Sequence, residues 1–285
     1  MSADIGQMQH RLGLQRLGYT GVALTQPAEL WGAAGVSAVE EQVAEEVPIA
    51  LVYNGVPHVV MMATPADLED FAVGFSLTEE LVPGTAEILG LKVERYSLGV
   101  EVQLNVTPAC ATAIANRTRS LTGRTGCGIC GSATIEGVLK QLHPVPPGPS
   151  ISPAAVHRAL AELGARQPLN QETGTVHAAG WAGVNGEILL VREDVGRHNA
   201  LDKLVGALAR AGTHQAGFVV VTSRASFEMV QKATVLGAPL VAAISGPTGL
   251  AVRVAEQSGV TLVGFARGDR LTCYTHPERL REPAA

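Results

Sequence analysis

Two cysteines separated by two residues, Cys127 and Cys130, are the side chains in this 285-residue sequence best suited to chemistry. They stand in the run GCGICG, whose glycines let a bulky partner approach both sulfur atoms closely. Arginines precede the pair at positions 117, 119 and 124, and nearby cations lower the pKa of a cysteine thiol. The segment 116–131 therefore predicts a functional loop with a thiolate that can attack another sulfur atom.

A zinc site is an alternative use of the same pair. Structural zinc requires four ligands, and Cys110 and His143 are the residues that could be recruited to complete the set. A zinc deaminase needs His-x-Glu upstream of Pro-Cys-x-x-Cys. Here Gly126 precedes Cys127, and the only His-x-Glu lies far downstream at 276–278. We therefore expect no metal ion bound directly by the protein.

Other interpretations of GCGICG have different requirements. The run matches the dinucleotide fingerprint G-x-G-x-x-G, but no apolar strand precedes it and no acidic residue follows at the required distance. A thioredoxin-like oxidoreductase would place the cysteines at the start of a helix in a βαβ unit, which a glycine-flanked loop does not favour. Two ordinary loop cysteines without a chemical role stay open as an explanation.

Polar segments follow several predicted strands in the second half of the chain. They combine hydroxyls, glycines and arginines, and they are Arg192–Lys203, Thr222–Ser226, Ser245–Thr248 and Phe265–Arg270. Strand ends build the sites of α/β sheets, and helix N-termini bind phosphate groups. We expect a ligand with several phosphates there, without nucleotide hydrolysis because no Walker lysine motif is present. The alternatives are a solvated helix start at 192–203 and a solvated C-terminal turn at 265–270.

The helices and strands that must position these residues form two groups, which a proline-rich segment separates. Residues 1–44 are expected to be peripheral. Residues 45–143 predict a smaller antiparallel α+β part, with a hairpin turn at Asn54–Gly55 and a helix capped by Thr64. Residues 144–151 contain four prolines and predict a semi-rigid linker. Residues 152–285 alternate short apolar strands with helices, which predicts an α/β core with a largely parallel sheet covered on both faces.

Composition narrows the functional classes. Apolar residues make up 46% of the chain and charged residues 16%, which is enough for a sizeable core. The net charge of −5 argues against binding to nucleic acid or to an anionic membrane surface. No apolar run is long enough to span a bilayer, and no signal peptide is evident. We expect a soluble cytoplasmic protein whose cysteines do not form a structural disulfide framework.

Several longer stretches resemble a known family. They are EEVPIALVYNGVPHVVMMATPADLEDFAVGF, GCGICG, REDVGRHNALDK, TSRASFEMVQKA and GVTLVGFARGDRLTCYTHPERL. In this combination and order, across residues 45–280, the sequence is similar to the FdhD family, the accessory sulfurtransferases of formate dehydrogenase. One departure is Glu79-Glu80-Leu81, where the family often shows Glu-Gly-Ile.

The resemblance implies a fold, a reaction and site residues. It implies a three-layer α/β sheet like that of cytidine deaminase, in a cytoplasmic homodimer. The reaction would accept sulfur from a cysteine desulfurase as a persulfide on Cys127, with Cys130 as the second cysteine. The sulfur would pass to the Mo-bis(molybdopterin guanine dinucleotide) cofactor of formate dehydrogenase. The cofactor-binding segment would comprise Phe265, Ala266, Arg267, Gly268, Asp269 and Arg270. The alternative is a non-catalytic chaperone that presents this cofactor and has inert cysteines.

Overall fold

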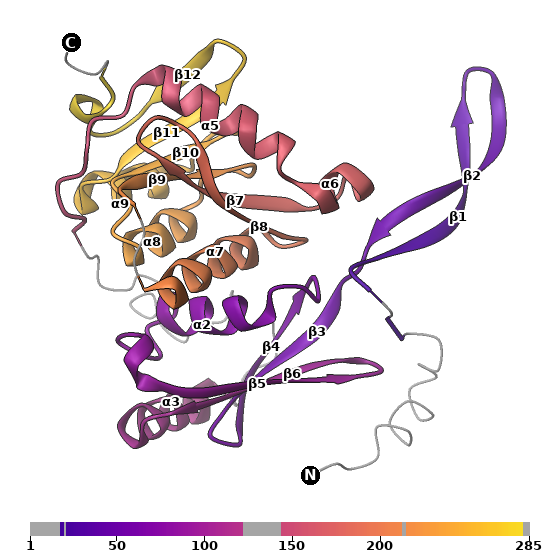
Figure 1. Cartoon of the computed structure of the whole chain (residues 1–285), viewed down its shortest axis with the longest axis vertical. Coiled ribbons are helices and arrows are strands. Elements are labelled where there is room, and N and C mark those ends of the chain that lie inside the picture. Colours follow the sequence, from indigo (N-terminus) through magenta and orange to yellow (C-terminus); the bar gives the residue numbers. More distant parts are fainter. Residues whose placement is uncertain (1–17, 20, 122–143, 213–214, 282–285) are drawn as a thin grey trace.

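The structure, a computed structural model, describes residues 18–19, 21–121, 144–212 and 215–281. Helices and strands alternate through most of this length, which confirms the predicted α/β class. Figure 1 shows two layered parts stacked on each other and a β-hairpin that stands away from both. No helix in the described ranges is long and apolar enough to cross a membrane.

The larger sheet has six strands in the order β12-β11-β10-β9-β7-β8. Their bounds are β7 (His177–Gly183), β8 (Ile188–Asp194), β9 (Gly217–Val221), β10 (Leu240–Ala243), β11 (Thr261–Arg267) and β12 (Arg270–Cys273). β10 pairs in parallel with β9 and β11, whereas β7 is antiparallel to both β8 and β9. As a consequence β8, β9, β10 and β11 run in one direction and end at the same edge, which we call the strand-end edge.

Helices cover both faces of this sheet, as predicted. Helix α5 (Pro153–Ala165) packs on one face, where it buries Val156 and Leu163 against Phe218. The opposite face is covered by α7 (Arg197–Ala211), α8 (Phe227–Val235) and α9 (Gly249–Ser258). Their apolar side chains surround alternate strand residues such as Trp181 and Val219. Because successive side chains of each strand point to opposite faces of the sheet, a separate hydrophobic core forms on each face.

The smaller sheet has the order β4-β3-β6-β5. Its strands are β3 (Val47–Tyr53), β4 (Val56–Ala63), β5 (Ile88–Tyr96) and β6 (Gly99–Val106), and α2 (Leu68–Thr78) and α3 (Pro108–Leu121) accompany it. Asn54 and Gly55 have φ of 48° and 79°, so the predicted two-residue hairpin turn is confirmed. The two hairpins are antiparallel, but β3 and β6, which join them, are parallel. Short helical turns lie at α6 (Pro168–Thr173), η1 (Thr85–Glu87) and η2 (Pro277–Arg279).

Thr64 does not cap a helix, which corrects the prediction for this position. Helix α2 begins at Leu68, and the preceding Asp67 is in the left-handed region with φ of 51°. Thr64 is instead fully buried, and its backbone and hydroxyl bond to residues at the end of β8. The sequence signal of a threonine before a proline is the same in both arrangements.

The two parts meet where α2 crosses α7. Gly74 of α2 and Gly206 of α7 lie at the crossing, and each has no room for a side chain. A Cβ atom on Gly206 would be 1.8 Å from the carbonyl oxygen of Asp70, and one on Gly74 would be 1.7 Å from that of Asp202. The two backbones therefore approach as closely as glycine permits.

The segments outside the two parts also have defined contacts. Strands β1 (Ala23–Gly32) and β2 (Gly35–Ala44) pair over ten residues each and form the projecting hairpin, which we call the arm. The proline-rich residues 144–151 run along the side of the sheet where β10 and β11 begin. There the Val145 N–H donates to Ser258 O at 2.9 Å, and Gly148 lies against Pro239.

Candidate functional site at the strand-end edge

The structure brings the predicted polar segments to the strand-end edge and links each to its neighbour. The Phe265 N–H donates to Ser245 O at 3.3 Å, which joins the ends of β11 and β10. The Thr248 N–H donates to Ala225 O at 3.0 Å, which joins the ends of β10 and β9. Thr222 Oγ1 accepts from the Ala178 N–H at the start of β7. One continuous surface results, and the N-termini of α7, α8 and α9 open onto it.

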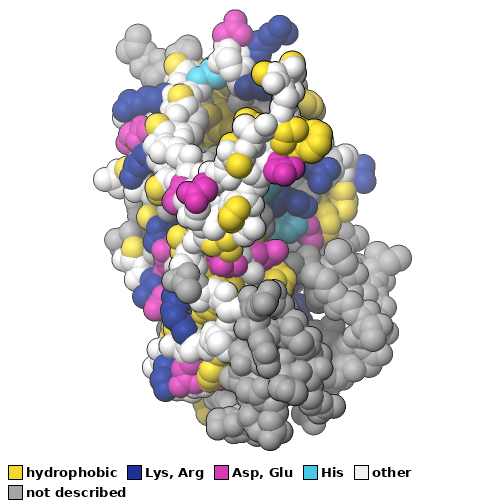
Figure 2. Space-filling view, turned by 90° about the vertical axis from the view of Figure 1, so that its right-hand side faces the viewer, with side chains coloured by type: hydrophobic (Ala, Val, Ile, Leu, Met, Phe, Trp, Pro, Cys, Tyr) yellow, Lys and Arg dark blue, Asp and Glu magenta, His cyan; other side chains and the backbone are white. Residues whose placement is uncertain are grey.

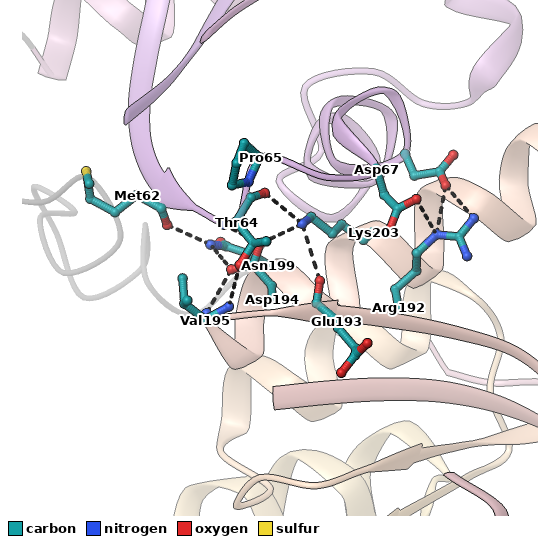
Figure 3. A network of polar contacts seen from close by, with 12 residues as sticks. Met62, Thr64, Pro65, Asp67, Arg192, Glu193, Asp194, Val195, Asn199 and Lys203 are labelled. Carbon is teal, nitrogen blue, oxygen red and sulfur yellow. Dashed lines mark hydrogen bonds and ion pairs between the residues drawn. The ribbon is translucent and has the colours of Figure 1, made fainter. Parts of the chain in front are cut away.

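Most of the segment Arg192–Lys203 has a structural role, so the alternative of a solvated helix start is wrong. Asp194 and Lys203 are fully buried, and their charged groups are 2.7 Å apart. Asp194 also accepts from the backbone N–H of Thr64 at 3.1 Å, and Lys203 donates to Thr64 O at 3.0 Å. Asn199 completes the network by donating to Met62 O at 2.8 Å (Figure 3). These bonds fix the start of α7 against the end of β4.

Two further carboxylates form buried contacts between the parts. Asp70 of α2 accepts two hydrogen bonds from Arg192, at 2.7 and 2.9 Å. Asp202 of α7 accepts from Lys232 of α8 at 2.9 Å and from Thr78 of α2 at 2.6 Å. Burial raises the pKa of Asp202, while the facing carboxylate of Asp202 raises the pKa of Lys232 against the opposing effect of burial. These residues hold the layers in place behind the edge rather than facing a ligand.

Residues Phe265–Arg270 comprise the end of β11, a tight turn and the first residue of β12, and the alternative of a solvated turn stays open. Arg267 pairs in register with Arg270, and both are exposed. Gly268 and Asp269 make the turn, where Gly268 has φ of 62°, and Ala266 is buried in the sheet. The two guanidinium groups therefore lie at the end of one short hairpin.

Phe265 is held in a strained conformation. Its φ is 50°, in the left-handed region that bulky side chains seldom adopt, and 44% of its surface is exposed. The ring rests on Gly246, where a Cβ atom would be 2.5 Å from Phe265 Cζ. Strain of this kind is characteristic of functional sites. An exposed aromatic ring beside arginines can stack on a planar ligand.

The starts of α7 and α8 carry a second polar group on the same edge. His198 Nε2 lies 2.9 Å from a carboxylate oxygen of Glu228, and this contact lowers the pKa of Glu228. Burial, together with the charges of Arg197 and His198, lowers the pKa of His177 at the start of β7. Arg197 Nε and Ser226 Oγ are shielded from solvent and have no hydrogen-bond partner within the described chain. Neither α7 nor α8 has a side-chain N-cap, so donors at this place are available to an anion.

Cys127 and Cys130 lie outside the described residues, so their predicted role is not tested by the geometry. The described residues that precede them end with helix α3, on which Arg117 donates to the carbonyl oxygen of Glu79 at 2.8 Å. It resumes beside the starts of β10 and β11, at the edge opposite to the strand-end edge. No group of three or more potential metal ligands occurs in the described ranges, which do not include the two cysteines or His143.

Sequence reasoning did not assign the buried partners Thr64, Asp70 and Thr78 to this region. Asp70 and Thr78 both lie on α2, and each is more than 120 positions away in the sequence from the residue that it contacts. No local pattern marks such a pair. The one available signal was the density of ionisable residues in 192–203, which require partners when they are buried.

Comparison with known proteins accords with this architecture. The family model described as FdhD/NarQ family matches residues 44–281. A relative from Variovorax paradoxus (strain S110), named sulfur carrier protein FdhD, is 51% identical over 259 residues, which is 89% of this chain and 93% of the relative. A relative of the same name from Xanthomonas axonopodis pv. citri (strain 306) is 52% identical over 85% of this chain and 86% of its own length.

A solved structure is also similar. It is a crystal structure of a protein from Desulfotalea psychrophila, whose proposed role is that of a formate dehydrogenase accessory protein. The TM-score is 0.73 with 25% sequence identity, and the match covers 91% of this chain and 100% of the other. Because the family model and the relatives each match most of the chain, this protein belongs to the FdhD/NarQ family.

Proposed function

We propose that this chain is a sulfurtransferase required for formate dehydrogenase activity. It would accept sulfur from a cysteine desulfurase as a persulfide on Cys127. It would then transfer that sulfur to the Mo-bis(molybdopterin guanine dinucleotide) cofactor. The proposal is supported by family membership and by relatives named as sulfur carriers. A structural relative whose proposed role is that of a formate dehydrogenase accessory protein adds further support.

The observation that carries the proposal is the set of unused donors on the strand-end edge. The cofactor is a polyanion because each guanine dinucleotide half contains a pyrophosphate. Arg267 and Arg270 offer exposed cationic donors, while Arg197 Nε and Ser226 Oγ are buried and have no hydrogen-bond partner among the described residues. A buried polar group without a partner is costly, so a ligand that bonds to these atoms would gain that free energy on binding. The residues present therefore fit a phosphate-rich cargo.

Two cysteines are sufficient for both steps of the proposed reaction, the acceptance of sulfur and its release. The Cys127 thiolate attacks the outer sulfur of the desulfurase persulfide, the sulfur–sulfur bond breaks, and the desulfurase cysteine leaves as a thiolate. Cys127 then carries the sulfur as its own persulfide. When the Cys130 thiolate attacks Cys127 Sγ, a disulfide forms and the outer sulfur leaves as hydrosulfide for the cofactor. A reductant of the thiol class then restores both cysteines.

A reconstituted maturation assay tests the function. Cofactor-free formate dehydrogenase, the unsulfurated cofactor, a desulfurase and cysteine are combined with the wild type, Cys127→Ser or Cys130→Ser. We expect activity with the wild type and none with Cys127→Ser. If Cys127→Ser restores full activity, the protein acts as a chaperone with inert cysteines and the proposal is wrong. Cys130→Ser shows whether release of the sulfur requires the second cysteine.

A further inference from the structure

The arm exposes apolar side chains on both of its faces. Trp31 is 73% exposed, and Val36, which is its partner in the register, is 51% exposed. Leu30 on the opposite face is 57% exposed. An exposed apolar group of this size, on an element with no core of its own, is typical of a protein interaction site.

The ribbon geometry also points to a partner. A two-stranded hairpin is marginally stable in water unless another element covers it. The arm pairs in register from Ala23–Ala44 to Gly32–Gly35, yet its contacts with the body lie near its base, where α6 meets β2. Figure 1 shows the rest of the ribbon standing clear of both parts. Within the described ranges this outer part of the hairpin is uncovered, so it is available to a surface on another molecule.

The charge of the arm indicates what kind of surface would bind it. The arm contains Glu29, Glu40 and Glu41, and Glu45 and Glu46 follow it directly. No lysine, arginine or histidine occurs between residues 21 and 57. An acidic and apolar ribbon repels nucleic acid and anionic membranes. It complements a protein surface that is apolar and positively charged.

The arm rises on the same side as the proposed cargo site. At its base, Val22 lines a cavity of about 490 Å³ together with Arg192 and Glu193, which are among the last residues of β8. The base of the arm is therefore next to the strand-end edge. Figure 2 views the molecule from this side, where acidic, basic and hydrophobic side chains are interspersed on the described surface.

We propose that the arm is the docking element for the cofactor-free acceptor enzyme, formate dehydrogenase. This inference rests on the proposed function. An enzyme that takes up a cofactor with two pyrophosphate groups must present a positively charged entrance, which an acidic arm complements. A desulfurase, whose substrate is cysteine, has no such requirement. A protein that binds the arm lies beside the strand-end edge, where the cargo would be transferred.

The test measures the affinity of purified cofactor-free formate dehydrogenase for immobilised variants of the full chain. Leu30→Ser/Trp31→Ala removes the exposed tip, and Glu40→Lys/Glu41→Lys reverses the charge without changing the apolar residues. The matched control is Leu89→Ser, because Leu89 is 65% exposed on β5, away from the arm. We expect Kd to rise by roughly 30-fold for the tip variant, the factor for losing a central tryptophan contact. The charge variant should also bind more weakly, and the control should bind like the wild type.

Other outcomes overturn the inference. Unchanged affinity in both arm variants means that the acceptor binds elsewhere. A change of molecular mass in solution with unchanged acceptor affinity makes the arm a contact between copies of this chain. A slower sulfur loading by the desulfurase, again with unchanged acceptor affinity, assigns the arm to that partner. Sulfur loading and guanine-nucleotide binding of the wild type, measured in parallel, test the proposed function independently of the arm.

Discussion

At the scale of single residues, Arg267 and Arg270 are the exposed groups of the strand-end edge with the clearest expected effect. A charge-assisted hydrogen bond to phosphate is worth about 1.5–3 kcal/mol. Arg270→Ala should therefore weaken the binding of GDP, a fragment of the cofactor, by roughly 10- to 150-fold. Arg158→Ala, which alters an exposed arginine on α5, is the control. Equal GDP affinities at matched salt would place the phosphate site at Arg197 and Ser226 instead.

Glu80 provides a second test at this scale. Its φ is 55°, which is unfavourable for any residue with a Cβ, and it stands where the resembling family often has glycine. Glu80→Gly should stabilise the fold by about 0.5–1 kcal/mol, because the relief of backbone strain exceeds the entropy that glycine adds to the unfolded chain. Urea unfolding measures the change. Glu69→Gly, the same substitution at an exposed position in the first turn of α2, should instead destabilise by up to about 1 kcal/mol. Equal effects at both positions would contradict the strain at Glu80.

The sequence predicted residue roles well where the signal was local. Asn54–Gly55 turns as expected because few residues other than Asn and Gly tolerate both positive φ angles of that turn. The role of Thr64 was wrong because its partner, Asp194, is 130 positions away. A buried polar contact across that distance has no signature in the residues around Thr64.

At the scale of elements, the α2–α7 crossing fixes how the two parts meet. Gly206→Ala should destabilise the protein by about 3 kcal/mol or more, because the new methyl group would overlap a backbone oxygen that cannot move aside. Gly164→Ala is the matched control: it lies near the end of helix α5 with no atom within 4 Å of the added Cβ. The control should be neutral or stabilise by up to about 1 kcal/mol. Similar unfolding midpoints for the two variants would show that α2 and α7 can move apart at this crossing without loss of stability.

Elements with a strong apolar pattern can be located from the sequence, and others were missed for compositional reasons. Helix α7 has apolar residues at helical spacing, and strands β9, β10 and β11 consist mostly of consecutive apolar residues, so the positions of these elements were predictable. Strand β7 reads HAAGWAG, which lacks the β-branched residues that favour strands. It is a strand because its backbone pairs with β8 on one side and with β9 on the other. The arm was also missed, because most of its side chains are exposed and contribute no alternating apolar pattern.

At the scale of the whole molecule, stability should depend on pH through two half-buried histidines. Burial lowers the pKa of both His58 and His177 below 6.5, so the folded state favours their neutral forms. Their contribution to stability is present above about pH 6.5 and is lost as the pH falls through the lowered pKa values. The urea midpoint should therefore be lower at pH 5 than at pH 7.5. His58→Gln/His177→Gln should reduce this difference, and an unchanged difference would contradict the assignment.

The central claim is that Cys127 carries sulfur for the cargo, and intact-protein mass spectrometry tests it most directly. The full chain is incubated with a cysteine desulfurase and cysteine, and its mass is measured under non-reducing conditions. We expect a gain of one sulfur atom per chain that dithiothreitol removes and that Cys127→Ser lacks. If the wild type gains no sulfur, or if Cys127→Ser gains as much as the wild type, Cys127 is not the sulfur carrier.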